Sequence, residues 1–119
     1  MTTLARSEEF SISVAPTGCV AFVHPHGELD LGTAPLLEQA LEQVQGYDTL
    51  VLDLRALTFM DSTGVHLVVH TCARADARGC ELRIITGSPE VQRVFELTGL
   101  QERLRPYFDH PDKAPSASG

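Results

Sequence analysis

Alternating apolar and polar residues near the start of the chain predict a β-hairpin. Phe10, Ile12 and Val14 are separated by single serines, which is the period-two pattern of a half-exposed strand. A Pro-Thr-Gly turn precedes a second apolar run at residues 20–23, as expected for the returning strand of a hairpin. We predict that this strand breaks at Pro25, because proline cannot donate a backbone hydrogen bond.

The rest of the chain alternates between helical and strand patterns. Thr33 is a good N-cap residue and precedes an apolar stripe with helical spacing that Gly46 ends. Residues 50–54 are nearly all apolar, which is typical of a strand covered on both faces. Ser88 followed by a proline is a typical start of a later helix. In chain order, the predicted elements are a helix over residues 33–46, a strand over 50–54, a helix over 61–78, a strand over 82–85, a helix over 88–99 and a short strand or extended segment over 104–108.

A hairpin followed by helix–strand alternation predicts an α/β domain with a mixed β-sheet of about four to five strands and about three to four helices. Because crossover connections are right-handed, the parallel strands should lie in the middle of the sheet. A chain of 119 residues is expected to form a single domain. We predict a flexible N-terminus over residues 1–8, the folded domain over 9–109 and a disordered tail, rich in Pro, Ser and Ala, over 110–119.

Composition and charge argue against several functional classes. The net charge is −7 and the only lysine is Lys113, whereas nucleic acids and anionic membranes are bound by basic surfaces. Cys19, Cys72 and Cys80 are widely spaced, and we interpret them as apolar fillers in a reducing compartment. The sequence has neither a signal peptide nor an apolar run of the roughly 18 residues that span a bilayer. We therefore expect a soluble cytoplasmic protein.

The candidate chemistry lies at the start of the predicted second helix. Residues 61–65, Asp-Ser-Thr-Gly-Val, place a serine where a strand ends and a helix begins. The first N–H groups of a helix lack intrahelical partners, and the helix dipole adds positive potential there, so a phosphate group is stabilised. Asp, Ser and Thr are also good N-caps. The pattern alone leaves both interpretations open, a helix cap and a phosphorylation switch.

Three segments of the chain, in the expected order, resemble one protein family. Residues 57–65, Leu-Thr-Phe-Met-Asp-Ser-Thr-Gly-Val, are similar to the signature of the bacterial anti-sigma factor antagonists, which are small STAS-domain proteins. Residues 27–30, Gly-Glu-Leu-Asp, resemble the family's other recurrent segment, and residues 88–100 resemble its last helix and the exit from it. The match extends over roughly residues 8–108 and implies a STAS-type fold.

The resemblance implies that Ser62 is a phosphorylation site, with Thr63 as the weaker alternative acceptor. It implies that the unphosphorylated protein binds an anti-sigma factor of the serine-kinase type, which frees a sigma factor, and that phosphorylation ends this binding. A serine phosphatase of the PP2C type would reset the switch. No cofactor, metal or catalysis is implied. The expected partner-binding residues are Gly27, Glu28, Asp30, Asp61, Ser62, Thr63, Gly64 and His66.

Several polar residues keep more than one interpretation. Asp30 is either an ordinary turn aspartate or a group that orients the docking surface or accepts a hydrogen bond from a loop N–H. His66 and His70 are four residues apart on the second helix. A solvated polar face is favoured over a metal site for this pair, because no third ligand is evident, and contact with the partner is a further interpretation. Asp53, at a strand end, is expected to be solvated.

Other functions are weighed against the antagonist. A STAS module could serve in a stress-sensing assembly, as an accessory subunit of a transporter, or as a nucleotide-binding domain. A Ser-His-Asp hydrolase is disfavoured because Met60 stands where the Gly-x-Ser-x-Gly elbow has a glycine. A kinase or NTPase is disfavoured because the sequence has no Gly-x-x-x-x-Gly-Lys phosphate loop.

Overall fold

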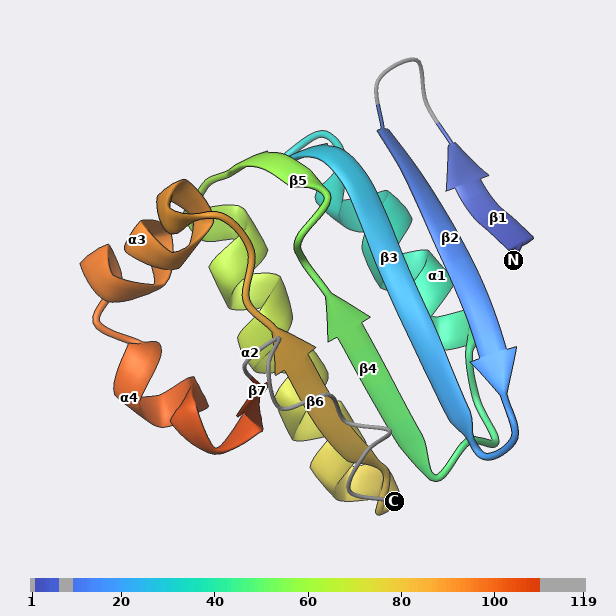
Figure 1. Cartoon of the computed structure of the whole chain (residues 1–119). Helices are drawn as coiled ribbons and strands as arrows, with labels where there is room; N and C mark the ends of the chain where they lie inside the picture. The colour runs from blue at the N-terminus through green and yellow to red at the C-terminus, as the bar shows by residue number, and fades with distance from the viewer. Residues whose placement is uncertain (1, 7–9, 110–119) are drawn as a thin grey trace.

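The computed structural model describes residues 2–6 and 10–109 (Figure 1). The strands in these ranges are β1 (Thr2–Arg6), β2 (Phe10–Thr17), β3 (Val20–Leu29), β4 (Thr49–Asp53), β5 (Leu57–Met60), β6 (Glu81–Ile85) and β7 (Phe108–Asp109). The helices are α1 (Ala34–Gln43), α2 (Ser62–Arg78), α3 (Pro89–Leu97) and α4 (Gln101–Leu104), and a 3-10 helix follows at Arg105–Tyr107.

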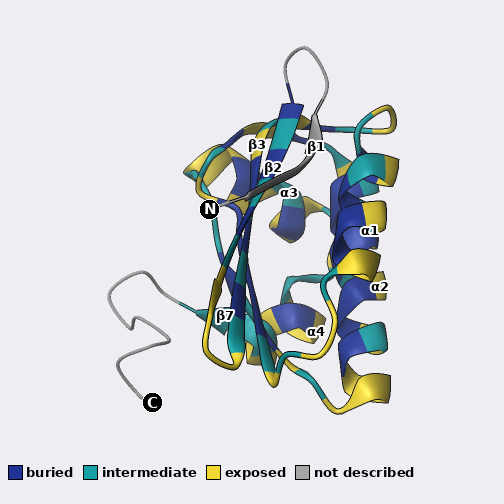
Figure 2. Ribbon diagram, turned by 90° about the vertical axis from the view of Figure 1, so that its right-hand side faces the viewer, coloured by how far each residue is buried: buried dark blue, intermediate teal, exposed yellow. Residues whose placement is uncertain are grey.

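The strands form one mixed sheet with the order β1-β2-β3-β4-β6-β7, and β5 pairs with the end of β3. The pairs β1–β2 and β2–β3 are antiparallel, whereas β3–β4, β4–β6 and β6–β7 are parallel. The helices cover one face of this sheet (Figure 2). The predicted α/β class, with an N-terminal hairpin followed by parallel strands, is confirmed. The short strands β1 and β5 are additional to the predicted ones.

The hydrophobic core lies between the sheet and the helices. Along β2 and β3, buried residues alternate with partly exposed ones, because successive side chains of a strand point to opposite faces. The largest fully buried side chains come from β2, β3, β4, the residue after β4, β6 and all the named helices; among them are Ile12, Leu29, Leu37, Leu52, Leu54, Val65, Val68, Ile84, Phe95 and Leu104. The residues that alternate with the buried ones along β2 and β3 lie on the opposite face of the sheet, which the helices do not cover.

Strand β3 continues through Pro25, so the predicted break at this residue is wrong. Parallel pairing with β4 covers residues 20–23, and pairing with β5 covers residues 27–29. Pro25 lies between these two parallel ladders, so its missing N–H interrupts neither of them. On the other side of β3 the antiparallel pairing with β2 runs through Pro25, which is opposite Ile12. The strand therefore runs on and carries Gly27 and Glu28 to the candidate site.

The C-terminal end of the described chain differs from the prediction. Residues 104–108 are largely helical rather than extended, and only Phe108–Asp109 pairs with β6. The Phe108 ring packs edge-on against Phe95 with centroids 5.3 Å apart, so tertiary packing decides this segment. Of the residues 1–8 that the sequence predicts to be flexible, the structure describes Thr2–Arg6, which pair with the outer edge of β2, where an edge strand offers unpaired backbone groups. The flexibility of this segment stays a prediction. The predicted tail over 110–119 lies outside the described residues.

Candidate functional site

Helix α2 begins at Ser62, directly after β5, and its cap is Asp61. The Asp61 carboxylate accepts a hydrogen bond from the Thr63 N–H at 2.9 Å, which satisfies one of the free N–H groups of the helix start. Ser62 is the first helical residue and is exposed. The two interpretations of the sequence, helix cap and candidate phosphorylation site, therefore apply to two neighbouring residues. Asp61 caps the helix, and the Ser62 hydroxyl is left accessible.

Gly64 is buried, and its small size serves the packing of α2. A Cβ at this position would lie 2.5 Å from Met60 Cγ and 2.9 Å from Leu29 Cδ2. A favourable contact between carbon atoms needs roughly 3.5–4.0 Å. The sequence predicts Gly64 in the binding surface, but in the structure its close contacts are internal, with β3 and β5.

The end of β3 lies beside the serine segment. In the parallel ladder between β3 and β5, Leu29 is opposite Met60. The Asp61 N–H donates to the Leu29 carbonyl at 3.2 Å. The structure therefore brings together the two segments that the sequence analysis treats as one surface, residues 27–30 and 61–63.

Asp30 shapes the turn that leads from β3 into α1. Its Oδ1 accepts the N–H of Gly32 at 3.0 Å and that of Thr33 at 3.1 Å. The Asp30 N–H donates to Thr33 Oγ1 at 2.9 Å, and the Thr33 hydroxyl donates to the Glu28 carbonyl at 2.7 Å. The prediction that the Thr33 side chain caps α1 is wrong, because this hydroxyl is used inside the turn. Asp30 is thus a turn aspartate that binds loop N–H groups, and its part in orienting a docking surface stays a prediction.

Two large apolar side chains flank this surface. Leu31, in the turn after β3, is 77% exposed, and Phe59, on β5, is 47% exposed. Phe59 is opposite Glu28 in the β3–β5 ladder. Contiguous exposed apolar patches mark protein-binding surfaces, whereas single exposed apolar side chains are ordinary, so Leu31 and Phe59 gain weight only from their place beside residues 27–30 and 61–63. Sequence reasoning did not single out either residue for binding, because only the fold reveals which apolar side chains remain outside the core.

The histidines of α2 lie on its outer side. His66 and His70 are both exposed, and they follow Ser62 at helical spacing along one stripe. Within the part of the chain that the structure describes, no group of three or more His, Cys, Asp or Glu side chains is placed to hold a metal ion. Among the helices of residues 2–6 and 10–109, none is long and apolar enough to cross a membrane.

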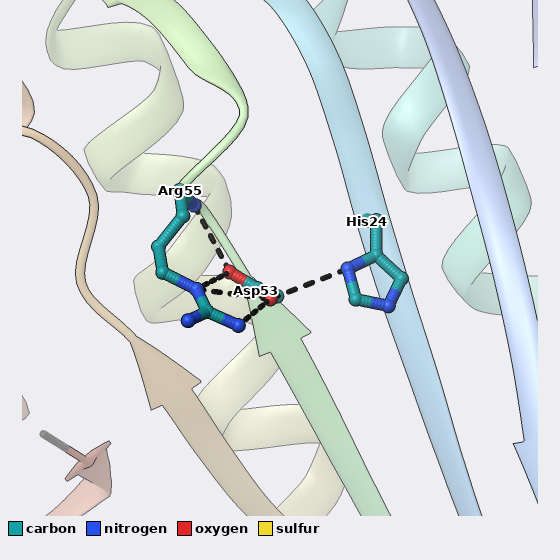
Figure 3. A network of polar contacts seen from close by, with 3 residues as sticks. All are labelled: His24, Asp53 and Arg55. Atoms are coloured by element: carbon teal, nitrogen blue, oxygen red, sulfur yellow. Dashed lines mark hydrogen bonds and ion pairs between the residues drawn. The ribbon is translucent and has the colours of Figure 1, made fainter. Parts of the chain in front are cut away.

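A polar cluster lies on the sheet face opposite the helices (Figure 3). The Asp53 side chain is only 6% exposed, forms an ion pair with Arg55 Nη2 at 2.8 Å, and lies 3.3 Å from His24 Nδ1, which is an ion pair when the imidazole is protonated. Burial raises the pKa of Asp53, but hydrogen bonds from Arg55 and the charges of Arg55 and His24 outweigh burial and lower the pKa. The expectation that Asp53 is solvated is wrong, since Arg55 folds back on it and His24 pairs with it from β3.

Known proteins of one family match this chain in sequence and in structure. A family model described as STAS domain matches residues 11–114. An anti-sigma-B factor antagonist of Staphylococcus aureus (strain NCTC 8325 / PS 47) is 37% identical over 80 residues, which cover 66% of this chain and 74% of that protein. A protein of the same name from Listeria monocytogenes is 38% identical over 78 residues, 64% of this chain and 68% of that protein. An anti-sigma factor antagonist from Mycobacterium paratuberculosis has a crystal structure that matches with a TM-score of 0.73 at 28% identity, covering 90% of this chain and 89% of that one.

Proposed function

We propose, because the chain belongs to the STAS domain family, that it acts as an anti-sigma factor antagonist controlled by phosphorylation at Ser62. In its unphosphorylated form it binds an anti-sigma factor, and a sigma factor is released. Phosphorylation ends the binding. The names of the relatives from Staphylococcus aureus and Listeria monocytogenes support this class of partner. The protein works in the cytoplasm by binding and catalyses no reaction.

The observation that carries the proposal is the exposed Ser62 beside a cap that does not use it. Because Asp61 accepts the Thr63 N–H, a phosphate on Ser62 removes no capping hydrogen bond from α2. The helix start also stabilises negative charge. The fold should therefore tolerate the modification, and its effect falls on whatever protein contacts this surface.

The charge around Ser62 explains how phosphorylation acts on a partner. The segments 27–33 and 57–66 contain Glu28, Asp30 and Asp61 but no lysine or arginine. A phosphate adds roughly −1.5 to −2 charges at pH 7. A partner that docks over a neutral hydroxyl would have to bury this hydrated dianion without a matching group, which costs several kcal/mol. A penalty of about 3 kcal/mol corresponds to roughly a hundredfold loss of affinity.

The proposal includes the kinase that phosphorylates Ser62 and the phosphatase that removes the phosphate. The anti-sigma factor is itself the serine kinase, and it has to reach the Ser62 hydroxyl in the bound state. A phosphatase of the PP2C type removes the phosphate. Ser62 is the acceptor rather than Thr63, because Ser62 is exposed whereas Thr63 is half-buried. The partner surface consists of Glu28, Asp30, Ser62 and His66, with Leu31 and Phe59 as apolar contacts.

The test is affinity capture from a lysate of the source organism with the wild type, Ser62→Ala and Ser62→Asp as baits. The proposal expects the wild type and Ser62→Ala to retain a kinase-type anti-sigma factor and Ser62→Asp to lose it. Gln43→Glu is the matched control, because it adds a negative charge on an exposed residue at the end of α1 away from the Asp30 turn. Equal retention by all baits would contradict the switch, and recovery of transporter subunits would point to an accessory role.

A further inference from the structure

The cluster around Asp53 has no part in the proposed switch, yet both carboxylate oxygens of Asp53 are bonded on the open face of the sheet. Asp53 Oδ1 accepts the backbone N–H of Arg55 at 3.0 Å and its Nε–H at 3.0 Å. Asp53 Oδ2 accepts Arg55 Nη2 at 2.8 Å and faces His24 Nδ1 at 3.3 Å (Figure 3). The carboxylate thus ties the end of β4 both to the residue that follows it and to the neighbouring strand β3.

The residues that Asp53 holds connect β4 to β5. In this connection the Leu57 N–H donates to the Leu54 carbonyl at 3.1 Å, which closes a turn. The Ala56 carbonyl accepts the N–H of Gly27 at 3.3 Å. The parallel pairing of β3 shifts its register between Gly27 and Glu28. The connection therefore contacts β3 at Gly27, next to the residues where the register between β3 and β5 shifts.

The other side of this connection is closed by β6 and the residues after it. The Leu54 N–H donates to the Ile85 carbonyl at 3.0 Å. A Cβ added to Gly87 would lie 2.6 Å from the Leu54 carbonyl oxygen. The backbone of the connection has little room to move toward β6. Toward β3 it is held by the bond from the Gly27 N–H to the Ala56 carbonyl and by the contacts of Asp53 with Arg55 and His24.

We propose that Asp53 is a positioning residue for the Ser62 site, acting through Arg55 and His24. It fixes the β4–β5 connection against β3. The β3–β5 ladder and the bond from the Asp61 N–H to the Leu29 carbonyl connect this part of the backbone to the start of α2, so a shift of the connection would also shift Ser62. None of the three network residues belongs to the surface around Ser62. The effect on partner affinity rests on the proposed function, whereas the positioning itself is measured on the isolated protein.

The test is amide hydrogen exchange by NMR on Asp53→Asn and Arg55→Gln. The reporters are the amides of Gly27 and Asp61, whose acceptors lie in the connection and in β3, and the reference is the amide of Val68 inside α2. Asparagine keeps the size of Asp53 and removes its charge. Arg55→Gln is the second variant, because the Arg55 side chain is 55% exposed and its loss leaves the core intact.

The proposal expects both variants to speed exchange at the reporters about tenfold, while the reference changes by less than about twofold, since local opening is independent of global unfolding. Glu42→Gln is the control; it breaks an ion pair with Arg74, of 3.3 Å, at the far ends of α1 and α2 and should leave the reporters unchanged. Equal acceleration at reporters and reference would overturn the proposal, because the network would then only stabilise the whole fold. Unchanged exchange would overturn it as well. If the reporters respond but the captured partner binds equally well, positioning stands and the proposed docking surface fails.

Discussion

Replacing Gly64 by alanine tests how the start of α2 is held. The new Cβ would lie 2.5 Å from Met60 Cγ, 2.9 Å from Met60 Sδ and 2.9 Å from Leu29 Cδ2. Each distance is about 1 Å shorter than a favourable contact, and Leu29 and Met60 are themselves buried. Overpacking of this kind costs about 1–3 kcal/mol. The better helix propensity of alanine returns at most about 1 kcal/mol, so we expect a net destabilisation of about 1–2 kcal/mol.

Urea unfolding of the wild type and Gly64→Ala, followed by circular dichroism, measures this difference. The matched control is Gly32→Ala, because a Cβ at Gly32 would meet only Asp30 Oδ1, at the ordinary distance of 3.5 Å. The control should change the free energy of unfolding by less than about 0.5 kcal/mol. If Gly64→Ala is as stable as the wild type, the contacts of Gly64 with β3 and β5 do not limit how closely α2 packs, and the reasoning is refuted.

Three further predictions concern individual side chains. Asp61→Ala should destabilise the protein by about 1 kcal/mol because α2 loses its cap, whereas Asp61→Asn should stay near the wild type; urea midpoints that are equal for both variants would contradict the cap. The pKa of Asp53 is lowered in the folded protein, so its ionised carboxylate stabilises the fold. This stabilisation is fully present above the unfolded pKa of about 4 and is lost as the pH falls through the folded pKa. Unfolding of the wild type and Asp53→Asn between pH 6 and about pH 2 should therefore converge at the acid end, and a constant difference would contradict this. Burial, with the charge of Asp76, raises the pKa of Cys72 to about 12, and the thiolate is the reactive form of a cysteine. A thiol reagent at about pH 8 should therefore label the exposed Cys19 long before Cys72 in the folded protein. Mass spectrometry follows the labelling, and equal rates at the two cysteines would refute this.

The position of Ser62 at the start of a helix could be predicted from sequence, but not that Asp61 caps the helix while the Ser62 hydroxyl stays free of the cap. Helix start signals locate a cap to within a residue or two, since Asp, Ser and Thr all serve as caps. Which of them accepts the N–H depends on backbone angles at the junction. Asp61 is extended and Ser62 already helical, so only Asp61 has the geometry of a cap.

Two sequence predictions failed because they treated single residues without their neighbours in the fold. Pro25 was expected to end a strand, but β3 continues through it because its antiparallel pairing with β2, which includes Ile12 opposite Pro25, spans this position. On the other side of β3, Pro25 lies between the pairing with β4 and that with β5. Asp53 was expected to be solvated, because a lone carboxylate in an apolar run gives no sign of its partners. The pairing with His24 depends on which strands are adjacent, and hydrophobic periodicity does not contain that information.

The central claim is that phosphorylation of Ser62 switches binding to the anti-sigma factor. The most direct measurement is to phosphorylate the wild type with the captured kinase and ATP, locate the phosphate by mass spectrometry, and compare the Kd of both forms for that partner by calorimetry. The account predicts a single phosphate on Ser62, none on Ser62→Ala, and an affinity lower by roughly a hundredfold for the phosphorylated form. A phosphate on another residue, or equal Kd values for the two forms, would contradict it.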